Sequence, residues 1–175
     1  MKKWFVAAAV AVMVLALIIG CRPQKPPVMQ DSKQVAIFVL SDRGIKSGMK
    51  EDEVKDRNEM GQFMEENMIE TLKREGYNAT LIQNRSQYVS SLSNYLVSMK
   101  INDLRLVGRA SRGWGGLIAG PTILKSHYEV AGTSKKLSLS YDDEDTTTGD
   151  WTNSPRELND RLVKKINDRL VGKTK

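Results

Sequence analysis

Apolar residues recur along the chain with two different periods, and each period predicts a different kind of element. From Glu51 to Gly76 they return every three or four residues, which places them on one face of a helix. We therefore predict one long amphipathic helix that begins in an acidic turn and ends at Gly76. Packing of its methionine-rich face in the core is favoured over a role as a binding groove. That face comprises Met60, Phe63, Met64, Met68 and Leu72.

Five other segments carry the patterns of strands. Residues 34–40 contain an unbroken apolar run from Val35 to Leu40, which is typical of a strand covered on both faces. Residues 77–82 follow the long helix and are predicted to pair in parallel with that first strand. Residues 95–101, 122–130 and 137–141 alternate apolar with polar side chains, as strands with one wet face do. The last two of these are predicted to pair antiparallel.

A closing helix is predicted from Ser154 to Leu170. Ser154, Pro155 and Glu157 have the spacing of a capping box with proline at the first helical position. The order of the elements predicts an α+β fold, a mixed α/β sandwich. Its single mixed sheet has about five strands, with two main helices packed on one face.

The start of the chain has the pattern of an export signal. Lys2 and Lys3 precede an uncharged apolar run of 17 residues from Trp4 to Gly20. A basic start followed by an apolar stretch is typical of a secretory signal peptide. The run also reaches the lower limit of about 17–25 residues for a membrane-spanning helix, so an uncleaved anchor is the competing interpretation.

Ile18-Ile19-Gly20-Cys21 favours the first interpretation. These residues resemble the lipobox of bacterial lipoproteins, and Cys21 is the only cysteine in the chain. The resemblance implies that residues 1–20 are removed as a signal peptide and that acyl chains, palmitate among them, anchor Cys21 in a bilayer. Arg22, in place of aspartate, implies the outer membrane on its periplasmic side. A free or buried cysteine is the alternative.

Residues 21–33 are predicted to form the lipidated cysteine and a tether. Pro23, Pro26 and Pro27 fall here without apolar periodicity, and proline-rich chain stays extended at about 3.1 Å per residue. Residues 34–172 then form a single envelope domain that is large enough to bury a core. Because no second cysteine exists, this domain is expected to have no internal disulfide.

Charge is concentrated at one end of the chain. The sequence has 27 basic and 21 acidic residues, a net charge of +6. Removing Lys2 and Lys3 leaves 25 against 21, or +4, and the excess lies between Arg156 and Lys175. That segment could lie against anionic lipid or polymer, but a solvated helix face is favoured. We expect no nucleic-acid partner.

Residues that could carry chemistry are few. His127, the only histidine, falls on the polar face of its strand and cannot build an ordinary zinc site. Residues 142–150 are rich in carboxylates but lack the spacing of an EF-hand loop, so a solvated acidic loop is favoured. We therefore expect neither a metal nor a cofactor.

A glycine-rich loop is predicted from Gly108 to Pro121, between two strands. It lacks the Lys-Ser or Lys-Thr pair that a phosphate-binding loop needs after its last glycine. Its apolar residues are Trp114, Leu117 and Ile118. They are expected either to contact a partner or membrane, or to fold back over the sheet edge as a lid.

Several of these features together look like a group of envelope lipoproteins. They are the lipobox, the first strand from Val35 to Leu40, the helix end from Leu72 to Tyr77 and the glycine-rich Gly108 to Gly120. The domain of that group is similar to the amino-terminal domain of the translocation protein TolB and to the curli-secretion lipoprotein. The resemblance implies a fold and a role in envelope assemblies, without a reaction.

Two classes of function follow from the sequence. In the first, the chain is a non-catalytic, membrane-anchored accessory or assembly factor that binds another envelope protein or polymer. The alternative is an envelope hydrolase that uses a carboxylate pair, because such a pair leaves no local signature. The sequence contains no Gly-x-Ser-x-Gly, no His-Glu-x-x-His and no cysteine beyond Cys21. We therefore expect a protein that is not an enzyme.

Mass spectrometry of the mature protein tests the anchor. We expect residues 1–20 to be absent and acyl chains to be attached to Cys21, because the lipobox directs both steps. An unmodified thiol at Cys21, or a leader that is still attached, would contradict the predicted localisation.

Overall fold

The computed structural model describes residues 35–106, 121–134 and 136–171. The elements are β1 (Ala36–Asp42), α2 (Glu51–Arg74), β2 (Asn78–Leu81), the 3-10 turn η2 (Arg85–Gln87), β3 (Asn94–Arg105), β4 (Thr122–Gly132), β5 (Leu139–Thr147) and α3 (Asn153–Leu170). The strands form one sheet in the order β2-β1-β3-β4-β5. β1 is parallel to both β2 and β3, as predicted for β2, and β3, β4 and β5 form an antiparallel meander.

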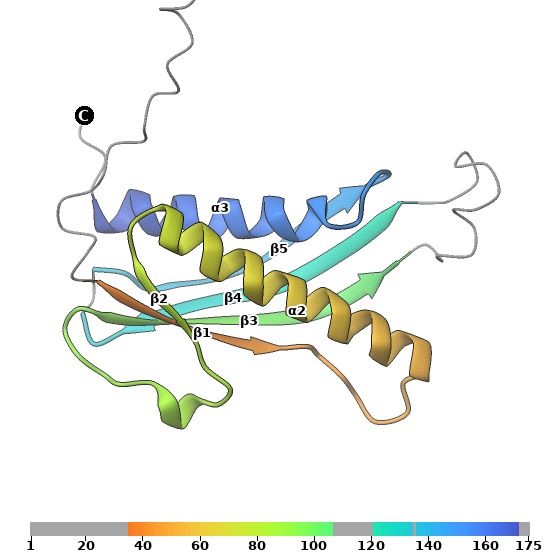
Figure 1. The fold of residues 1–175 in the computed structure, drawn as a ribbon, viewed down its shortest axis with the longest axis horizontal. Coiled ribbons are helices and arrows are strands. Elements are labelled where there is room, and N and C mark those ends of the chain that lie inside the picture. The colour runs from red at the N-terminus through yellow and green to blue at the C-terminus, as the bar shows by residue number, and fades with distance from the viewer. Residues whose placement is uncertain (1–34, 107–120, 135, 172–175) are drawn as a thin grey trace, which may run out of the picture.

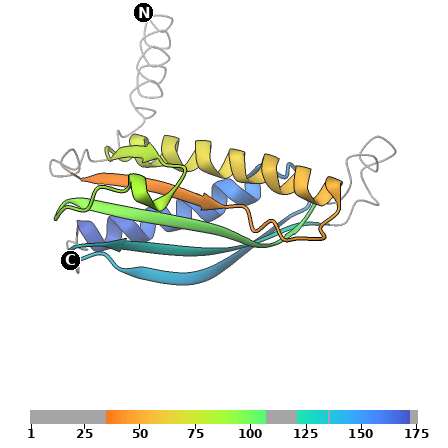
Figure 2. The same cartoon turned by 90° about the horizontal axis from the view of Figure 1, so that it is seen from below.

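Both helices lie on the same face of the sheet (Figures 1 and 2), which confirms the predicted α+β fold. We call this the covered face and the opposite one the open face. Inward side chains of the strands meet the apolar stripes of α2 and α3, and the methionine-rich stripe of α2 packs here as predicted. Fully buried members of this core include Ile37, Met60, Met64, Met68, Leu72, Leu124, Tyr128, Leu158, Leu162 and Ile166.

Different local contacts fix the C-terminal end of α2 and the N-terminal end of α3. After α2, Gly76 adopts a φ of 90° and the Tyr77 N–H donates to the Leu72 carbonyl at 3.0 Å, which confirms the predicted stop. The predicted capping box at α3 is wrong. The helix already begins at Asn153, because Asp150 accepts the N–H groups of Thr152 and Asn153 at 3.0 and 3.1 Å.

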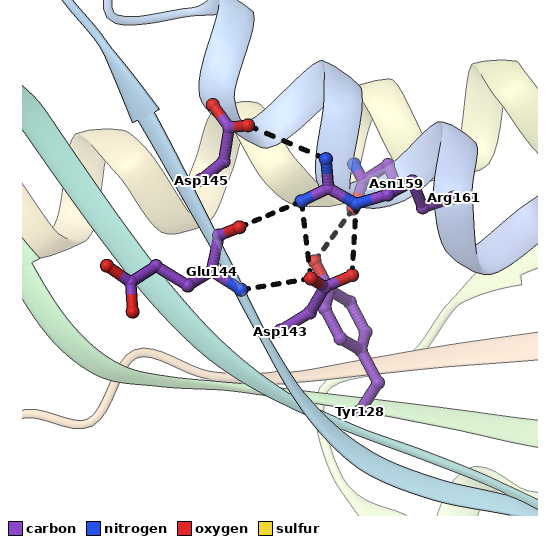
Figure 3. Close-up of polar contacts among 6 residues, drawn as sticks. All are labelled: Tyr128, Asp143, Glu144, Asp145, Asn159 and Arg161. Atoms are coloured by element: carbon purple, nitrogen blue, oxygen red, sulfur yellow. Dashed lines mark hydrogen bonds and ion pairs between the residues drawn. The ribbon is translucent and has the colours of Figure 1, made fainter.

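A buried amide joins α3 to α2 and to the sheet. Asn159 of α3 donates through Nδ2 to the Met64 carbonyl at 3.0 Å and to Asn67 Oδ1 at 2.9 Å, both on α2. Its Oδ1 accepts a hydrogen bond from the Tyr128 hydroxyl of β4 at 3.5 Å (Figure 3). An amide taken out of water is costly unless it is paired. This network therefore fixes how α3 is rotated against its neighbours.

The loop after β1 is held against a bulge in β3, just after Ile101. The Ile101 carbonyl accepts a hydrogen bond from Nη1 of the buried Arg57 at 3.1 Å, and the same nitrogen donates to the Arg43 carbonyl at 3.1 Å. Gly44 passes so close that a Cβ there would lie 2.0 Å from the Ile101 oxygen, and its φ is +62°. Only glycine fits this approach.

Two glycine variants separate backbone strain from crowding in this loop. Gly48 has a φ of +86° and open space around its Cβ position, so Gly48→Ala should lower the free energy of unfolding by about 1 kcal/mol. Gly44→Ala adds an overlap with the Ile101 carbonyl to similar strain, and we expect a loss of about 3 kcal/mol. Denaturant titration of both variants measures the difference. Equal losses would show that the close approach contributes nothing.

Candidate functional site

A row of polar side chains crosses four strands on the open face. Asp42, Lys100, His127 and Asp142 are cross-strand neighbours on β1, β3, β4 and β5. Lys100 Nζ lies 3.5 Å from Asp42 Oδ2, and His127 Nδ1 lies 3.0 Å from Asp142 Oδ1. Asn102 Nδ2 donates to the same Asp142 oxygen at 3.0 Å. The predicted position of His127 on a polar face is confirmed, and its neighbours satisfy it.

Ser140 brings this row close to the geometry of a catalytic triad. Its Oγ lies 3.4 Å from His127 Nε2, while Asp142 holds the other ring nitrogen. Nucleophile, general base and orienting carboxylate stand in this order in acyl-transfer enzymes. The side chains of His127 and Asp142 are, however, 37% and 76% exposed. Water screens their charges and competes for the hydroxyl, so we interpret the trio as a surface hydrogen-bond network.

The acidic residues that the sequence placed in a loop belong to β5. Asp142 and Glu144 lie on the open face, and Asp143 and Asp145 lie on the covered face. Like charges this close disfavour a strand unless cations offset them. On the open face Lys125 Nζ lies 3.0 Å from Glu144 Oε2. The loop prediction is therefore wrong because the neighbouring elements supply a partner for each carboxylate.

Arg161 of α3 binds the two carboxylates on the covered face (Figure 3). Nε and Nη2 donate to Asp143 at 3.1 and 3.3 Å, and Nη1 lies 3.5 Å from Asp145 Oδ1. Burial alone would lower the pKa of Arg161, but the hydrogen bonds and charges of Asp143 and Asp145 raise it above its usual value. This carboxylate pair therefore ties β5 to α3.

Two stacked tyrosines lie beside Arg161, with ring centroids 5.7 Å apart. Burial, assisted by the charge of Asp143, raises the pKa of Tyr141 to about 12. Burial also raises the pKa of Tyr128 well above its usual value, with smaller contributions from Tyr141 and Asp143. Both phenols therefore stay protonated near neutral pH. They contribute packing to the site.

Exposed apolar side chains gather at one end of the open face. Val89 and Leu92 are 64% and 78% exposed, on the loop between η2 and β3. Beside this loop lies a hollow of about 240 Å³, lined by Arg85, Tyr88, Ser90, Leu96, Ala131, Gly132 and Thr133. We call Val89, Leu92 and this hollow the loop patch.

The same loop explains two errors in the predicted burial of strands. Leu96 was expected on a wet face but is 2% exposed, because the loop residues Tyr88 and Ser90 lie beside it. The first strand was expected to be covered on both faces. Ile37 and Val39 are fully buried on the covered face, whereas Phe38 on the open face is only half-buried, with the Tyr88 ring 5.4 Å away.

The residues selected from the sequence as an anchor or contact site are not part of this geometry. Cys21, Trp114, Leu117 and Ile118 lie outside the described residues. In the ranges that are described, no helix combines the length and apolar character needed to cross a bilayer. Within those same ranges, no three side chains of His, Cys, Asp or Glu converge as metal ligands.

Neither Arg161 nor the loop patch was predicted from the sequence as a functional feature. The signal for Arg161 was the basic excess after Arg156, which could be matched to the carboxylates of residues 142–145. The signal for the loop patch was weaker. Val89 and Leu92 are two apolar residues in a serine-rich stretch with no periodicity.

Comparison with known proteins gives resemblance at the level of structure. Neither a protein family nor a curated protein matches the sequence. Two crystal forms of the PelC dodecamer from Paraburkholderia phytofirmans, one of a single-residue variant, resemble the chain with TM-scores of 0.45 and 0.43. Their identities are 16% and 13%, and the matches cover 84% and 85% of this chain and 94% of each PelC chain.

A neuraminyllactose-binding hemagglutinin homolog from Helicobacter pylori also resembles the chain. Its TM-score is 0.31 at 13% identity, with 87% of this chain and 91% of that chain covered. At these scores and identities, the resemblances assign no function to this chain.

Reaction with a fluorophosphonate probe tests the Ser140 trio. We expect no labelling of Ser140, because its hydroxyl and His127 face open water. The comparison uses wild type, Ser140→Ala and His127→Ala, with an active serine hydrolase as the positive control. Labelling that disappears in both variants would show that Ser140 is an activated nucleophile and would favour the enzyme class.

Proposed function

We propose that the chain is a non-catalytic accessory lipoprotein of the bacterial envelope. Acyl chains on Cys21 hold it at the periplasmic side of the outer membrane, and its domain binds another envelope protein or polymer. The lipobox and the proline-rich residues 21–33 support the location. The loop patch supports the binding role.

The loop patch has the composition of a small interface centre. Val89 and Leu92 project into water beside a hollow whose floor includes Leu96 and Ala131, while Arg85 and other polar residues form part of its lining. Apolar centres with polar rims are typical of protein interfaces. An apolar side chain of this size gains about 1.5–3 kcal/mol on full burial, so covering Val89 and Leu92 with a partner is favourable.

Hydrogen bonds also hold this loop in one conformation in the absence of a partner. Ser90 Oγ lies 2.7 Å from Thr133 Oγ1 on the turn after β4, and Asn94 Nδ2 donates to the Val89 carbonyl at 2.7 Å. Tyr88 donates its hydroxyl to the Asn94 carbonyl at 3.0 Å. A preformed surface loses less conformational entropy on binding.

The position of the loop patch suits a tethered domain. The Ala36 N–H donates to the Ser93 carbonyl at 3.1 Å, so the patch lies at the end of the sheet where β1 begins. A domain held through the chain before Val35 would turn this end toward its anchor. We therefore place the partner near the membrane surface.

The hydrolase alternative lacks support from the carboxylate pair on the covered face. Asp143 and Asp145 form the pair on the covered face, but both bind Arg161 and their side chains are only 20% exposed. A glycosidase pair must face the bond that is cleaved. These carboxylates face α3.

Site-specific photo-crosslinking in envelopes tests the loop patch. A photoreactive residue at Leu92 should give a discrete cross-linked protein or polymer. With this probe kept in place, two double variants test the location of the contact. One combines Val89→Ser with Ile45→Ser, and the other combines Val89→Ser with Leu81→Ser. We expect both double variants to reduce the product equally, since Ile45 and Leu81 lie outside the patch and are 46% and 36% exposed.

Single variants complete this experiment. Val89→Ser alone should lower the yield several-fold, whereas Ile45→Ser alone should leave it unchanged. Cross-links to lipid only, or equal losses from both single variants, would contradict the proposal.

A further inference from the structure

The two edges of the sheet differ in length. β2 forms one edge with 4 residues, and β5 forms the other with 9. An outer strand offers backbone N–H and C=O groups along its free side, and other proteins use such edges to bind extended peptides. Within the described sheet no strand lies beyond β5.

The middle of the β5 edge is closed by the side chains around Arg161 (Figure 3). The Glu144 carbonyl accepts a hydrogen bond from Arg161 Nη2 at 3.0 Å, and the Glu144 N–H donates to Asp143 Oδ1 at 3.0 Å. The backbone of Glu144 therefore faces away from β4. Because this direction alternates along an antiparallel strand, Ser140 and Asp142 also turn their N–H and C=O groups outward.

A groove accompanies the open half of the edge. It has a volume of about 480 Å³ and lies between the start of β5 and the end of α3, lined by Leu139, Ser140, Tyr141, Lys165, Asp168 and Arg169. Lys165 Nζ lies 3.3 Å from the centroid of the Tyr141 ring. A strand added beside Ser140 would direct every second side chain into this groove, because side chains alternate between faces.

The charges in and around the groove select the occupant. Lys165 and Arg169 outnumber Asp168 in the lining. The acidic residues of β5 do not reverse this sign, since each already contacts a cation or His127, as described above. The groove thus combines apolar walls with an excess of positive charge.

We propose that the β5–α3 groove binds an extended acidic peptide segment of a partner protein, which adds as a short strand beside Ser140 and Asp142. Its backbone pairs with the open half of β5. Its groove-facing side chains place carboxylates near Lys165 and Arg169 and apolar groups against Leu139. This site is separate from the loop patch, and the proposal does not depend on the function proposed for that patch.

A defined peptide tests the groove on the full-length chain in detergent. The probe is a fluorescent, acetylated heptapeptide with threonine at every second position and valine and glutamate in turn at the positions between. Fluorescence anisotropy measures its Kd. We expect saturable binding below millimolar peptide, and weaker binding when lysine replaces glutamate or when alternate amides are N-methylated.

Three variants and one control variant assign the binding to this site. Lys165→Glu and Arg169→Glu should each raise the Kd about tenfold, while Lys164→Glu, the same charge change on the neighbouring exposed residue, should change it less than twofold. Ser140→Pro removes an outward N–H and should also raise the Kd without breaking a bond to β4. Melting temperatures confirm that each variant is folded.

Four results would overturn the proposal. They are the absence of binding at millimolar peptide, equal binding of the lysine peptide, an equal effect of Lys164→Glu, and an unchanged Kd in Ser140→Pro. Light scattering tests whether a second copy of the chain occupies this edge instead. A dimer that Ser140→Pro dissociates would show that a second copy of the chain, and not an acidic peptide, occupies this edge.

Discussion

Coverage of the sheet by helices on one face only is the constraint on which the rest of the structure depends. The covered face can be apolar, and the buried amide of Asn159 is joined there in a hydrogen-bond network. The open face has no such cover and meets water or the loop before β3. Its side chains therefore pair with each other across strands, as His127 and Asp142 do. The division between the apolar face and the polar face of the sheet follows from this asymmetry.

The order of elements could be predicted because periodicity is a local property. The spacing of Met60, Met64 and Met68 determines a helix face without knowledge of any distant residue. The extent of β5 could not be predicted in this way. Its four acidic residues are tolerated in a strand because Lys125 and His127 contact Glu144 and Asp142, and because Arg161, 18 positions after Asp143, binds Asp143 and Asp145. No local pattern reports those contacts.

The candidate sites also differ in whether a local sequence pattern could identify them. A lipobox is contiguous, so Cys21 could be singled out from the sequence, although it lies outside the described residues. The β5–α3 groove joins Leu139 to Arg169, and its existence depends on the packing of a helix against an edge strand. The start of α3 was mispredicted for a related reason. Asp150 binds the backbone ahead of Ser154, and this competing contact is not visible in the capping pattern.

The contact of Arg161 with the Glu144 carbonyl has a kinetic consequence. A strand that joins this edge must stop where that carbonyl is already occupied, so only a few backbone bonds can form. Each such bond contributes about 0.5–1.5 kcal/mol net, and a short pairing therefore has a brief lifetime. Copies of the domain are likewise hindered from stacking edge to edge into fibres. The arginine thereby limits any strand added at this edge to a short pairing that exchanges rapidly.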